Sequence, residues 1–280
     1  ADVQTLVFRI DGNELRQLAD RCVHKYCPHF YPQNVRQSTD TYKRWKWRNF
    51  LISFIHSNIT GFGSLFCCIY QPSLLVEVID SYLEAAYILT SISHGYFIYD
   101  LIEMLTHMTY KGSKELVVHH ILIISCFSLT VTQHKYCGYS SIALLIELSN
   151  IFLHFRQLLL ISNTPKTAKL YRINCYTNFG MFIVVRGVCL IWLWATLLWV
   201  LPRVPFVAKT IAFVSLIGIC TMTYVLFIRV YKSDFGNTGQ QTDVSITEQL
   251  VGAQTPPTTP EQTNGFTATA KDNAIHSKHS

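Results

Sequence analysis

The sequence predicts an all-α membrane protein, a bundle of six transmembrane helices with both termini in the cytosol. Two observations predict this class. Half of the 280 residues are hydrophobic and only 14% are charged, against about 25% charged in an average soluble protein. The apolar residues also gather in long stretches in the middle of the chain, and about twenty such residues form a helix that crosses about 30 Å of hydrocarbon. Runs of this length exclude a membrane β-barrel, whose strands are short and alternate.

Six stretches have the length and composition of membrane spans. Between them lie Pro72, Gly112, Pro165 and Pro202, which suit loops and helix ends. The predicted spans run approximately over residues 49–70, 82–105, 116–133, 138–162, 178–200 and 205–231. They belong to one membrane domain, which we place at residues 42–235.

Polar segments flank this domain. Residues 1–41 lack the apolar core of a signal peptide and are predicted to be a polar N-terminal segment. Residues 236–280 are rich in Thr, Gln and Pro, which predicts a disordered polar tail. Cys22, His24, Cys27 and His29 have the side chains of zinc ligands, but their spacing matches no common structural zinc site, so we expect no metal there.

The basic residues orient the bundle. A net charge of +6 would suit a nucleic-acid partner only if the Lys and Arg formed a patch, and here they lie between apolar stretches. We therefore expect no nucleic acid as a partner. By the positive-inside rule, the more basic set of loops faces the cytosol. That set contains Lys43, Arg44, Lys46, Arg48, Lys111, Lys114, Lys166, Lys169, Arg172, Arg229 and Lys232.

Ionisable side chains inside the spans are the candidates for function. Each costs about 2.5–3.5 kcal/mol to insert, so each requires a reason to be there. Such side chains are tolerated when they face the interior of a bundle around a cavity. The candidates in this chain, with the amides beside them, are His56, Asn58, Glu84, His94, Asp100, Glu103, His119, His120, Glu147, Asn150, His154, Arg156 and Arg186.

Depth and helical periodicity place several of these residues in one polar layer. At a rise of 1.5 Å per residue, five of them lie about 6–12 Å below the predicted cytosolic boundary. Glu147, Asn150 and His154 share a helix face, because offsets of three, four and seven residues stack along a helix. The five residues at this depth are His56, Asp100, His120, His154 and Arg186.

The adjacent His119 and His120 need a separate interpretation. Side chains one residue apart on a helix diverge by about 100°, so we do not expect both to point into one site. One of them is expected to face the cavity, where a His near a carboxylate can act as base, nucleophile or ligand. Its neighbour would then lie near the headgroups.

Structural roles are the alternatives for several candidates. Asp100 and Arg186 could form an ion pair between helices, and His56 and His94 could simply hydrogen-bond within the bundle. A metal site built from His56, His120, His154 and Asp100 is chemically conceivable, but no spacing motif supports it, and none is expected. The chain has no nucleophile elbow, phosphate loop or zinc-protease helix.

These residues resemble a known family. His119-His120 at the start of one span, followed in the next by Glu147-Leu-Ser-Asn-Ile-Phe-Leu-His154, resembles the signature of the TLC domain family, named for translocation-associated, ceramide-synthase and CLN-type membrane proteins. The resemblance covers about residues 42–235. Other segments are most similar to the subgroup of TLC domain-containing proteins 1 and 2: residues 48–56, Leu75-Val-Glu77, residues 95–100 and Ser233-Asp-Phe235.

The resemblance implies a helical bundle around a lipid-accessible cavity. In the ceramide synthases, a His pair and two aspartates of the next helix belong to the acyl-transfer site. His119 and His120 match the pair, whereas Glu147 and Asn150 occupy the aspartate positions and His154 replaces a glutamate. An amide in place of a carboxylate removes a charge and a proton acceptor, which argues against ceramide synthesis.

For the subgroup, the resemblance implies a plasma-membrane protein that adjusts phospholipid composition and membrane fluidity. The first hypothesis is therefore a regulatory protein whose cavity binds phospholipids or fatty acyl chains, with Asn150, His154, Arg186 and His56 as lipid-binding residues. No cofactor is expected. The resemblance implies the plasma membrane as the compartment, with the endoplasmic reticulum as the alternative, and the oligomeric state is open.

The second hypothesis is a lipid acyltransferase that uses acyl-CoA as a substrate. His119 or His120 would act as general base or acyl acceptor, Asp100 or Glu147 would orient it, and Arg186 would contact a phosphate. A channel ranks last, because the polar layer is one-sided and the chain has no filter-like segment.

Overall fold

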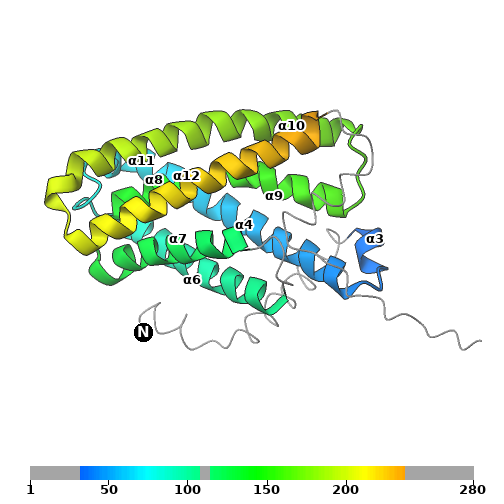
Figure 1. The fold of residues 1–280 in the computed structure, drawn as a ribbon, viewed down its shortest axis with the longest axis horizontal. Coiled ribbons are helices and arrows are strands. Elements are labelled where there is room, and N and C mark those ends of the chain that lie inside the picture. The colour runs from blue at the N-terminus through cyan, green and yellow to red at the C-terminus, as the bar shows by residue number, and fades with distance from the viewer. Residues whose placement is uncertain (1–31, 108–113, 237–280) are drawn as a thin grey trace, which may run out of the picture.

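A computed structural model describes residues 32–107 and 114–236, and every regular element within them is a helix (Figure 1). The predicted all-α class is therefore confirmed for these residues. The elements are α3 (Gln33–Arg36), α4 (Thr41–Tyr70), α5 (Ser73–Val76), α6 (Glu84–His107), α7 (Lys114–Gln133), α8 (Cys137–Leu145), α9 (Glu147–Ile161), α10 (Lys169–Met181), the π-helix η2 (Phe182–Arg186), α11 (Gly187–Val200), the 3-10 helix η3 (Leu201–Arg203) and α12 (Phe206–Phe235).

Five helical segments are long and apolar enough to cross a membrane. They are Tyr42–Tyr70, Glu115–Gln133, Cys137–Ile161, Lys169–Arg203 and Phe206–Phe235, which correspond to five of the six predicted spans. The remaining predicted span is α6, a helix of 24 residues. It is long enough to cross the hydrocarbon, at about 1.5 Å per residue, but it carries three carboxylates and is not among the five. That α6 spans the membrane, and that both termini are cytosolic, stay predictions.

The first long helix begins eight residues earlier than the sequence predicts. Asp40 caps its N-terminus, and its side chain accepts a hydrogen bond from the backbone N–H of Tyr42 at 2.9 Å. An Asp at the N-cap satisfies one of the free N–H groups of the first turn. The basic first turns of α4 extend past the apolar stretch, so hydropathy alone could not find this start.

Two of the predicted spans are interrupted. The fourth breaks at Ile146 into α8 and α9, where Ser149 donates its backbone N–H to the carbonyl of Ile146 at 3.0 Å. The fifth contains the π-helix η2 between α10 and α11. Single π turns are rare and often lie at functional sites. Both interruptions adjoin predicted site residues, namely Glu147 and Arg186.

Helix α4 lies in the middle of the bundle, packed against α9, α6 and α8 (Figure 1). Small side chains along α4 allow the close approach. A Cβ added to Gly61 would lie 2.9 Å from the backbone nitrogen of Leu148 in α9, and Ser64 donates a hydrogen bond to the carbonyl of Ser141 in α8 at 2.6 Å. Small residues and interhelical hydrogen bonds are typical of helix contacts in membranes.

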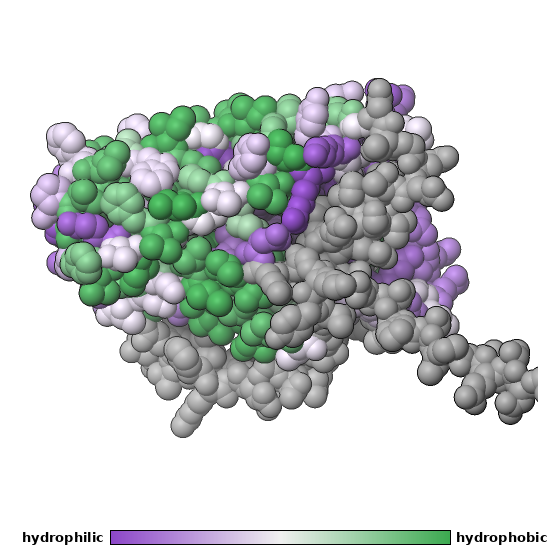
Figure 2. Space-filling model, in the orientation of Figure 1, coloured by the Kyte–Doolittle hydropathy of each residue, from purple (hydrophilic) through white to green (hydrophobic). Residues whose placement is uncertain are grey.

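The outer surface of the bundle is apolar over much of its length. Figure 2 shows hydrophobic residues, in green, over most of the face formed by α7, α11 and α12, with hydrophilic residues mainly toward the ends. Trp199 and Phe206 are each 80% exposed. A large exposed apolar surface is unusual for a soluble protein, so the surface supports a position in lipid.

A buried ion pair fixes the last turns of α12. Asp234 accepts hydrogen bonds from Arg156 of α9, at 2.7 Å from Nε and 2.5 Å from Nη2. Each of these two side chains is only 1% exposed. Tyr171 of α10 donates its hydroxyl to the same carboxylate at 2.8 Å. The pair therefore joins α9, α10 and α12 at one end of the bundle.

Two predicted features lie outside the described residues. They are the segment with Cys22, His24, Cys27 and His29, and the polar tail, of which only Gly236 is described. The domain boundaries proposed at residues 41/42 and 235/236 stay predictions.

Gly138 is required where α8 crosses α5. A Cβ at this position would lie 2.2 Å from the carbonyl oxygen of Leu74 and 2.7 Å from the Cα of Val78. Both are backbone atoms, so we expect Gly138→Ala to destabilise the protein by about 1–3 kcal/mol or more. The matched control is Gly180→Ala, because a Cβ there meets nothing within 4 Å. Melting temperatures of the purified variants in detergent check this, and equal melting temperatures would contradict it.

Candidate functional site

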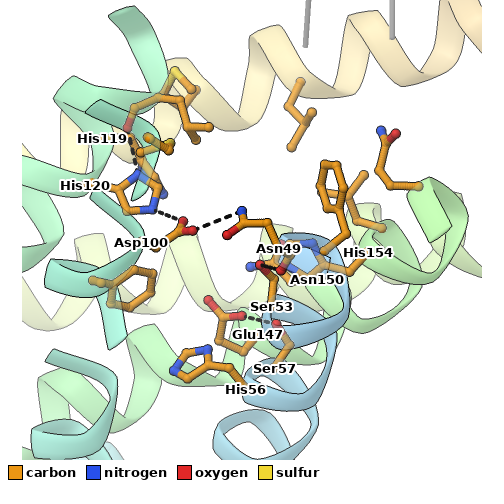
Figure 3. A pocket seen from close by; sticks show the side chains of 18 of the residues that line it. Asn49, Ser53, His56, Ser57, Asp100, His119, His120, Glu147, Asn150 and His154 are labelled. Carbon is orange, nitrogen blue, oxygen red and sulfur yellow. Dashed lines mark hydrogen bonds and ion pairs between the residues drawn. The ribbon is translucent and has the colours of Figure 1, made fainter. Parts of the chain in front are cut away.

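One pocket inside the bundle is lined by eight of the thirteen candidate residues, and Asn58, Glu84, His94, Glu103 and Arg156 are not part of its lining. Its cavity volume is about 190 Å³, and α4, α6, α7, α9, η2 and α12 all contribute to its lining. The polar side chains labelled in Figure 3 come from α4, α6, α7 and α9 and converge on it. The eight predicted residues in its lining are His56, Asp100, His119, His120, Glu147, Asn150, His154 and Arg186. Their roles as catalytic or lipid-binding residues stay predictions.

Asp100 and His120 form a buried pair between α6 and α7. His120 Nε2 lies 2.9 Å from Asp100 Oδ2, and Asn49 of α4 donates from Nδ2 to Asp100 Oδ1 at 3.1 Å (Figure 3). The second ring nitrogen of His120, Nδ1, lies 2.8 Å from the carbonyl oxygen of Leu116. Both nitrogens of His120 are therefore engaged.

The two acceptors around His120 determine where the protons lie. A carbonyl oxygen only accepts, so Nδ1 must carry the proton that it shares with Leu116. A neutral imidazole then has no second N–H for Asp100. The pair holds either an imidazolium with a carboxylate or a neutral imidazole with a protonated carboxyl group. In neither form does His120 offer a free nitrogen to a substrate.

His119 also lines the pocket, which corrects the expectation that only one His of the pair would do so. Its ring centroid lies 5.7 Å from that of His120, with the ring planes at 85°. The pocket extends around α7 far enough for both side chains to reach it. His119 Nδ1 is buried and has no hydrogen-bond partner among the described residues.

Glu147 is held by the central helix. Its Oε2 accepts a hydrogen bond from the Ser57 hydroxyl at 2.6 Å, and the side chain is 8% exposed (Figure 3). Nearby, the His56 ring stacks on the Tyr96 ring with centroids 3.8 Å apart, and His56 Nε2 lies 3.3 Å from the Ser93 hydroxyl. His56 therefore makes the contacts between helices that are expected of a structural histidine, and it also lines the pocket.

His94 lies elsewhere. Its Nε2 is 2.9 Å from the Ser128 hydroxyl of α7, and it does not line this pocket. His94 therefore forms a hydrogen bond between helices, which was the structural alternative to a functional role.

Arg186 enters the pocket from the end of the π-helix η2. Its Nε donates to the Ser149 hydroxyl at 2.8 Å, its Nη1 to the Thr223 hydroxyl at 3.2 Å, and its Nη2 to Asn150 Oδ1. The guanidinium also lies over the ring of Phe182, 4.5 Å from its centroid. The alternative of an ion pair between Asp100 and Arg186 is wrong, because Asp100 pairs with His120.

His154 and Asn150 come from the same face of α9 as Glu147, as the spacing predicts. His154 Nδ1 is buried without a hydrogen-bond partner among the described residues. The alternative metal site is not assembled: within residues 32–107 and 114–236, no group of three or more His, Cys, Asp or Glu side chains is arranged to hold a metal ion.

Apolar side chains form the rest of the pocket. Phe97 separates two of the histidines, with its ring centroid 5.6 Å from His56 and 5.7 Å from His120. The lining reaches the surface at Glu115 and Arg229, which form an ion pair of 3.3 Å and are 50% and 31% exposed. The remaining apolar lining consists of Phe50, Met104, Leu116, Leu153, Met222, Val225 and Leu226.

Several lining residues were missed from the sequence. Asn49, Ser53 and Ser57 repeat every four residues on one face of α4, and this periodicity was a usable signal. Ser and Asn are common in membrane helices, so their residue types alone did not point to a site. The lining residues of α12, by contrast, are apolar apart from Arg229. Only the tertiary structure shows that they belong to the pocket.

Comparison with known proteins gives a consistent family assignment. The TLC domain matches residues 46–232. TLC domain-containing protein 2 of Danio rerio is 36% identical over 204 residues, which cover 73% of this chain and 80% of that protein. TLC domain-containing protein 1 of Gallus gallus is 34% identical over 207 residues, covering 71% and 80% of the two chains.

A mammalian relative matches over a shorter region. TLC domain-containing protein 1 of Mus musculus is 34% identical over 155 residues, which cover 55% of this chain and 62% of that protein. No solved structure matches the chain.

Proposed function

Since this chain belongs to the TLC domain family, we propose that it is a multi-pass membrane protein that regulates the phospholipid composition and fluidity of its membrane. It does so by binding phospholipids or their fatty acyl chains in the pocket. The species affected include phosphatidylethanolamine, whose acyl chains it would select. The plasma membrane is the proposed compartment, and the endoplasmic reticulum is the alternative.

The observation that supports this proposal best is the mixed lining of the pocket. Polar groups on α4, α6, α7 and α9 face apolar side chains of α12, such as Met222 and Val225. A lipid has the same division into a polar head and an apolar chain. Ligand pockets are commonly apolar with a few convergent polar groups that fix the ligand. An intramembrane pocket of this kind suits an amphiphile that arrives from the bilayer.

Acyl transfer is a second candidate function, and His119 favours it. This residue offers a buried ring nitrogen without a partner in the described residues, whereas both nitrogens of His120 are engaged. In such a reaction the hydroxyl of a lysophospholipid attacks the thioester carbonyl of acyl-CoA. His119 takes the hydroxyl proton and passes it to the departing CoA thiolate, as a C–O bond forms and the C–S bond breaks. His120 and Asp100 would position the helix that carries His119.

Lipidomic comparison of cells with and without the protein tests the first function. We expect the acyl-chain composition of phosphatidylethanolamine to differ between the two, and identical compositions would contradict the proposal. Purified protein supplied with labelled acyl-CoA and lysophosphatidylethanolamine tests the second. Transfer should fall by about 100-fold or more in His119→Ala, the range for loss of a general base.

The matched control for the transfer assay is His94→Ala, because His94 lies outside the pocket. That variant should keep the transfer rate. If the lipidomic difference persists in cells that express a folded and correctly located His119→Ala variant, the protein acts without this chemistry, and the regulatory function stands alone.

A further inference from the structure

Arg186 carries a buried positive charge with neutral partners. The residue is 7% exposed, and its three hydrogen-bond acceptors are the Ser149 hydroxyl, the Thr223 hydroxyl and the Asn150 amide oxygen. A guanidinium has five N–H donors, so these acceptors leave two donors free within the described part of the chain. Buried charges in proteins are normally paired or bound to a ligand.

The carboxylates of the pocket are engaged with other groups. Asp100 bonds to His120 at 2.9 Å, Glu147 accepts from Ser57 at 2.6 Å, and Glu115 pairs with Arg229 at 3.3 Å. Glu147 lies near enough to attract the charge of Arg186, but among residues 32–107 and 114–236 none of the three carboxylates forms an ion pair with it. The Phe182 ring below the guanidinium attracts the cation, but it is weaker than an opposite charge.

The surroundings of Arg186 hold its planar group in one orientation. Ser149 and Asn150 are neighbours on α9, and Thr223 belongs to α12. Ser149 also donates its hydroxyl to the Ile146 carbonyl at 2.8 Å, so its oxygen accepts from Arg186 in a fixed position. The π-helix that ends at Arg186 sets where the side chain leaves the backbone. A guanidinium held in this way suits the bidentate binding of an oxyanion.

We propose that Arg186 is an oxyanion subsite of the pocket, which binds the phosphodiester or the carboxylate of the lipid. This inference rests on the proposed function, because it assumes that a lipid occupies the pocket. The oxyanion accepts the free N–H groups of Arg186 and places a negative charge in direct contact with the guanidinium. The acyl chain then lies along Met222 and Val225, which flank Thr223 on α12 and also line the pocket.

Two pairs of lipid probes test the subsite and distinguish the two sources of the oxyanion. Oleate and methyl oleate share a chain and differ in the carboxylate. Dioleoyl phosphatidylethanolamine and dioleoylglycerol share their chains and differ in the phosphoethanolamine headgroup, which contains the phosphodiester. Affinities are measured on the purified full chain in detergent, for the wild type, Arg186→Gln and Arg186→Met. Arg203→Gln is the matched control, since it removes an exposed arginine that does not line the pocket.

In one pair or both, the wild type should bind the probe that carries the oxyanion more tightly than the partner that lacks it by about tenfold or more, which corresponds to about 1.4 kcal/mol. Arg203→Gln should keep this ratio. In Arg186→Gln the ratio should fall to about one, with the affinity for the probe that lacks the oxyanion retained. Arg186→Met gives the same comparison if the Gln variant does not fold.

Two results would overturn the subsite while leaving lipid binding intact. One is equal affinity of the wild type for the probes with and without the oxyanion in both pairs, and the other is a wild-type ratio of affinities in both Arg186 variants. If no probe binds to folded wild-type protein, the proposed function falls together with the subsite.

Discussion

Replacing Asp234 by Asn is expected to lower the free energy of unfolding by about 3–5 kcal/mol. The substitution removes the negative charge from a pair whose side chains are each 1% exposed, and it leaves the Arg156 guanidinium buried without a counter-charge. Tyr171 and Cys175 also donate hydrogen bonds to this carboxylate, at 2.8 and 3.3 Å. The large cost comes from the unpaired cation more than from the lost contacts.

The melting temperature of purified protein measures this effect, with Asp80→Asn as the matched control. Asp80 also pairs with an arginine, Arg203 at 2.9 Å, but both side chains are at least 50% exposed. An exposed pair contributes about 0–1 kcal/mol, so this control should melt close to the wild type. Equal melting temperatures for the two variants would contradict the account.

A double variant separates the charge from the contacts. Arg156→Met combined with Asp234→Asn removes both charges, and replacing a buried ion pair by neutral groups is often nearly neutral for stability. We therefore expect the double variant to be more stable than Asp234→Asn alone. The result matters for the site, because α12 supplies Met222, Val225 and Leu226 to the pocket wall, and Asp234 fixes the end of that helix.

Much of this organisation could be predicted from the sequence. Hydropathy located the long helices, because a membrane imposes a minimum length on an apolar helix. The spacing of Glu147, Asn150 and His154 placed them on one face, because helical periodicity is local. The cost of an ionisable side chain in lipid predicted that Glu147 and His154 face inward. Each of these inferences uses either the local geometry of a helix or a property of the lipid bilayer.

The remaining features depend on contacts between distant parts of the chain. Arg156 and Asp234 are 78 residues apart, and nothing in either local sequence indicates that they meet. The π-helix before Arg186 has no sequence signal, because Phe182-Ile-Val-Val-Arg is compatible with an ordinary α-helix. That His119 and His120 share a pocket was missed from the sequence. A small site was assumed, which two side chains pointing about 100° apart on one helix could not both reach. The cavity instead extends around α7 and reaches both.

Filling the pocket should remove the bound lipid. Val225 lines the pocket from α12, and its neighbour Tyr224 is 67% exposed on the outer surface. Val225→Trp places a large ring in a cavity of about 190 Å³, so the lipid and the indole compete for the same space. Tyr224→Trp puts the same ring on the same helix but faces it outward, which makes it the matched control.

Val225→Ala completes the set, because it enlarges the pocket and should keep the lipid. Overpacking a buried position can itself destabilise a protein by about 1–3 kcal/mol. The comparison is therefore made on protein that elutes as a single species and melts within a few degrees of the wild type. If Val225→Trp fails this criterion, Leu226→Trp is the second pocket-filling variant, since Leu226 also lines the cavity.

Native mass spectrometry of the purified protein, which counts the lipids retained by each chain, tests the pocket most directly. The wild type, Tyr224→Trp and Val225→Ala should each retain a tightly bound lipid, and Val225→Trp should lose most of it. Equal lipid occupancy in all four proteins, or no retained lipid in the wild type, would contradict the claim that this pocket is a lipid site.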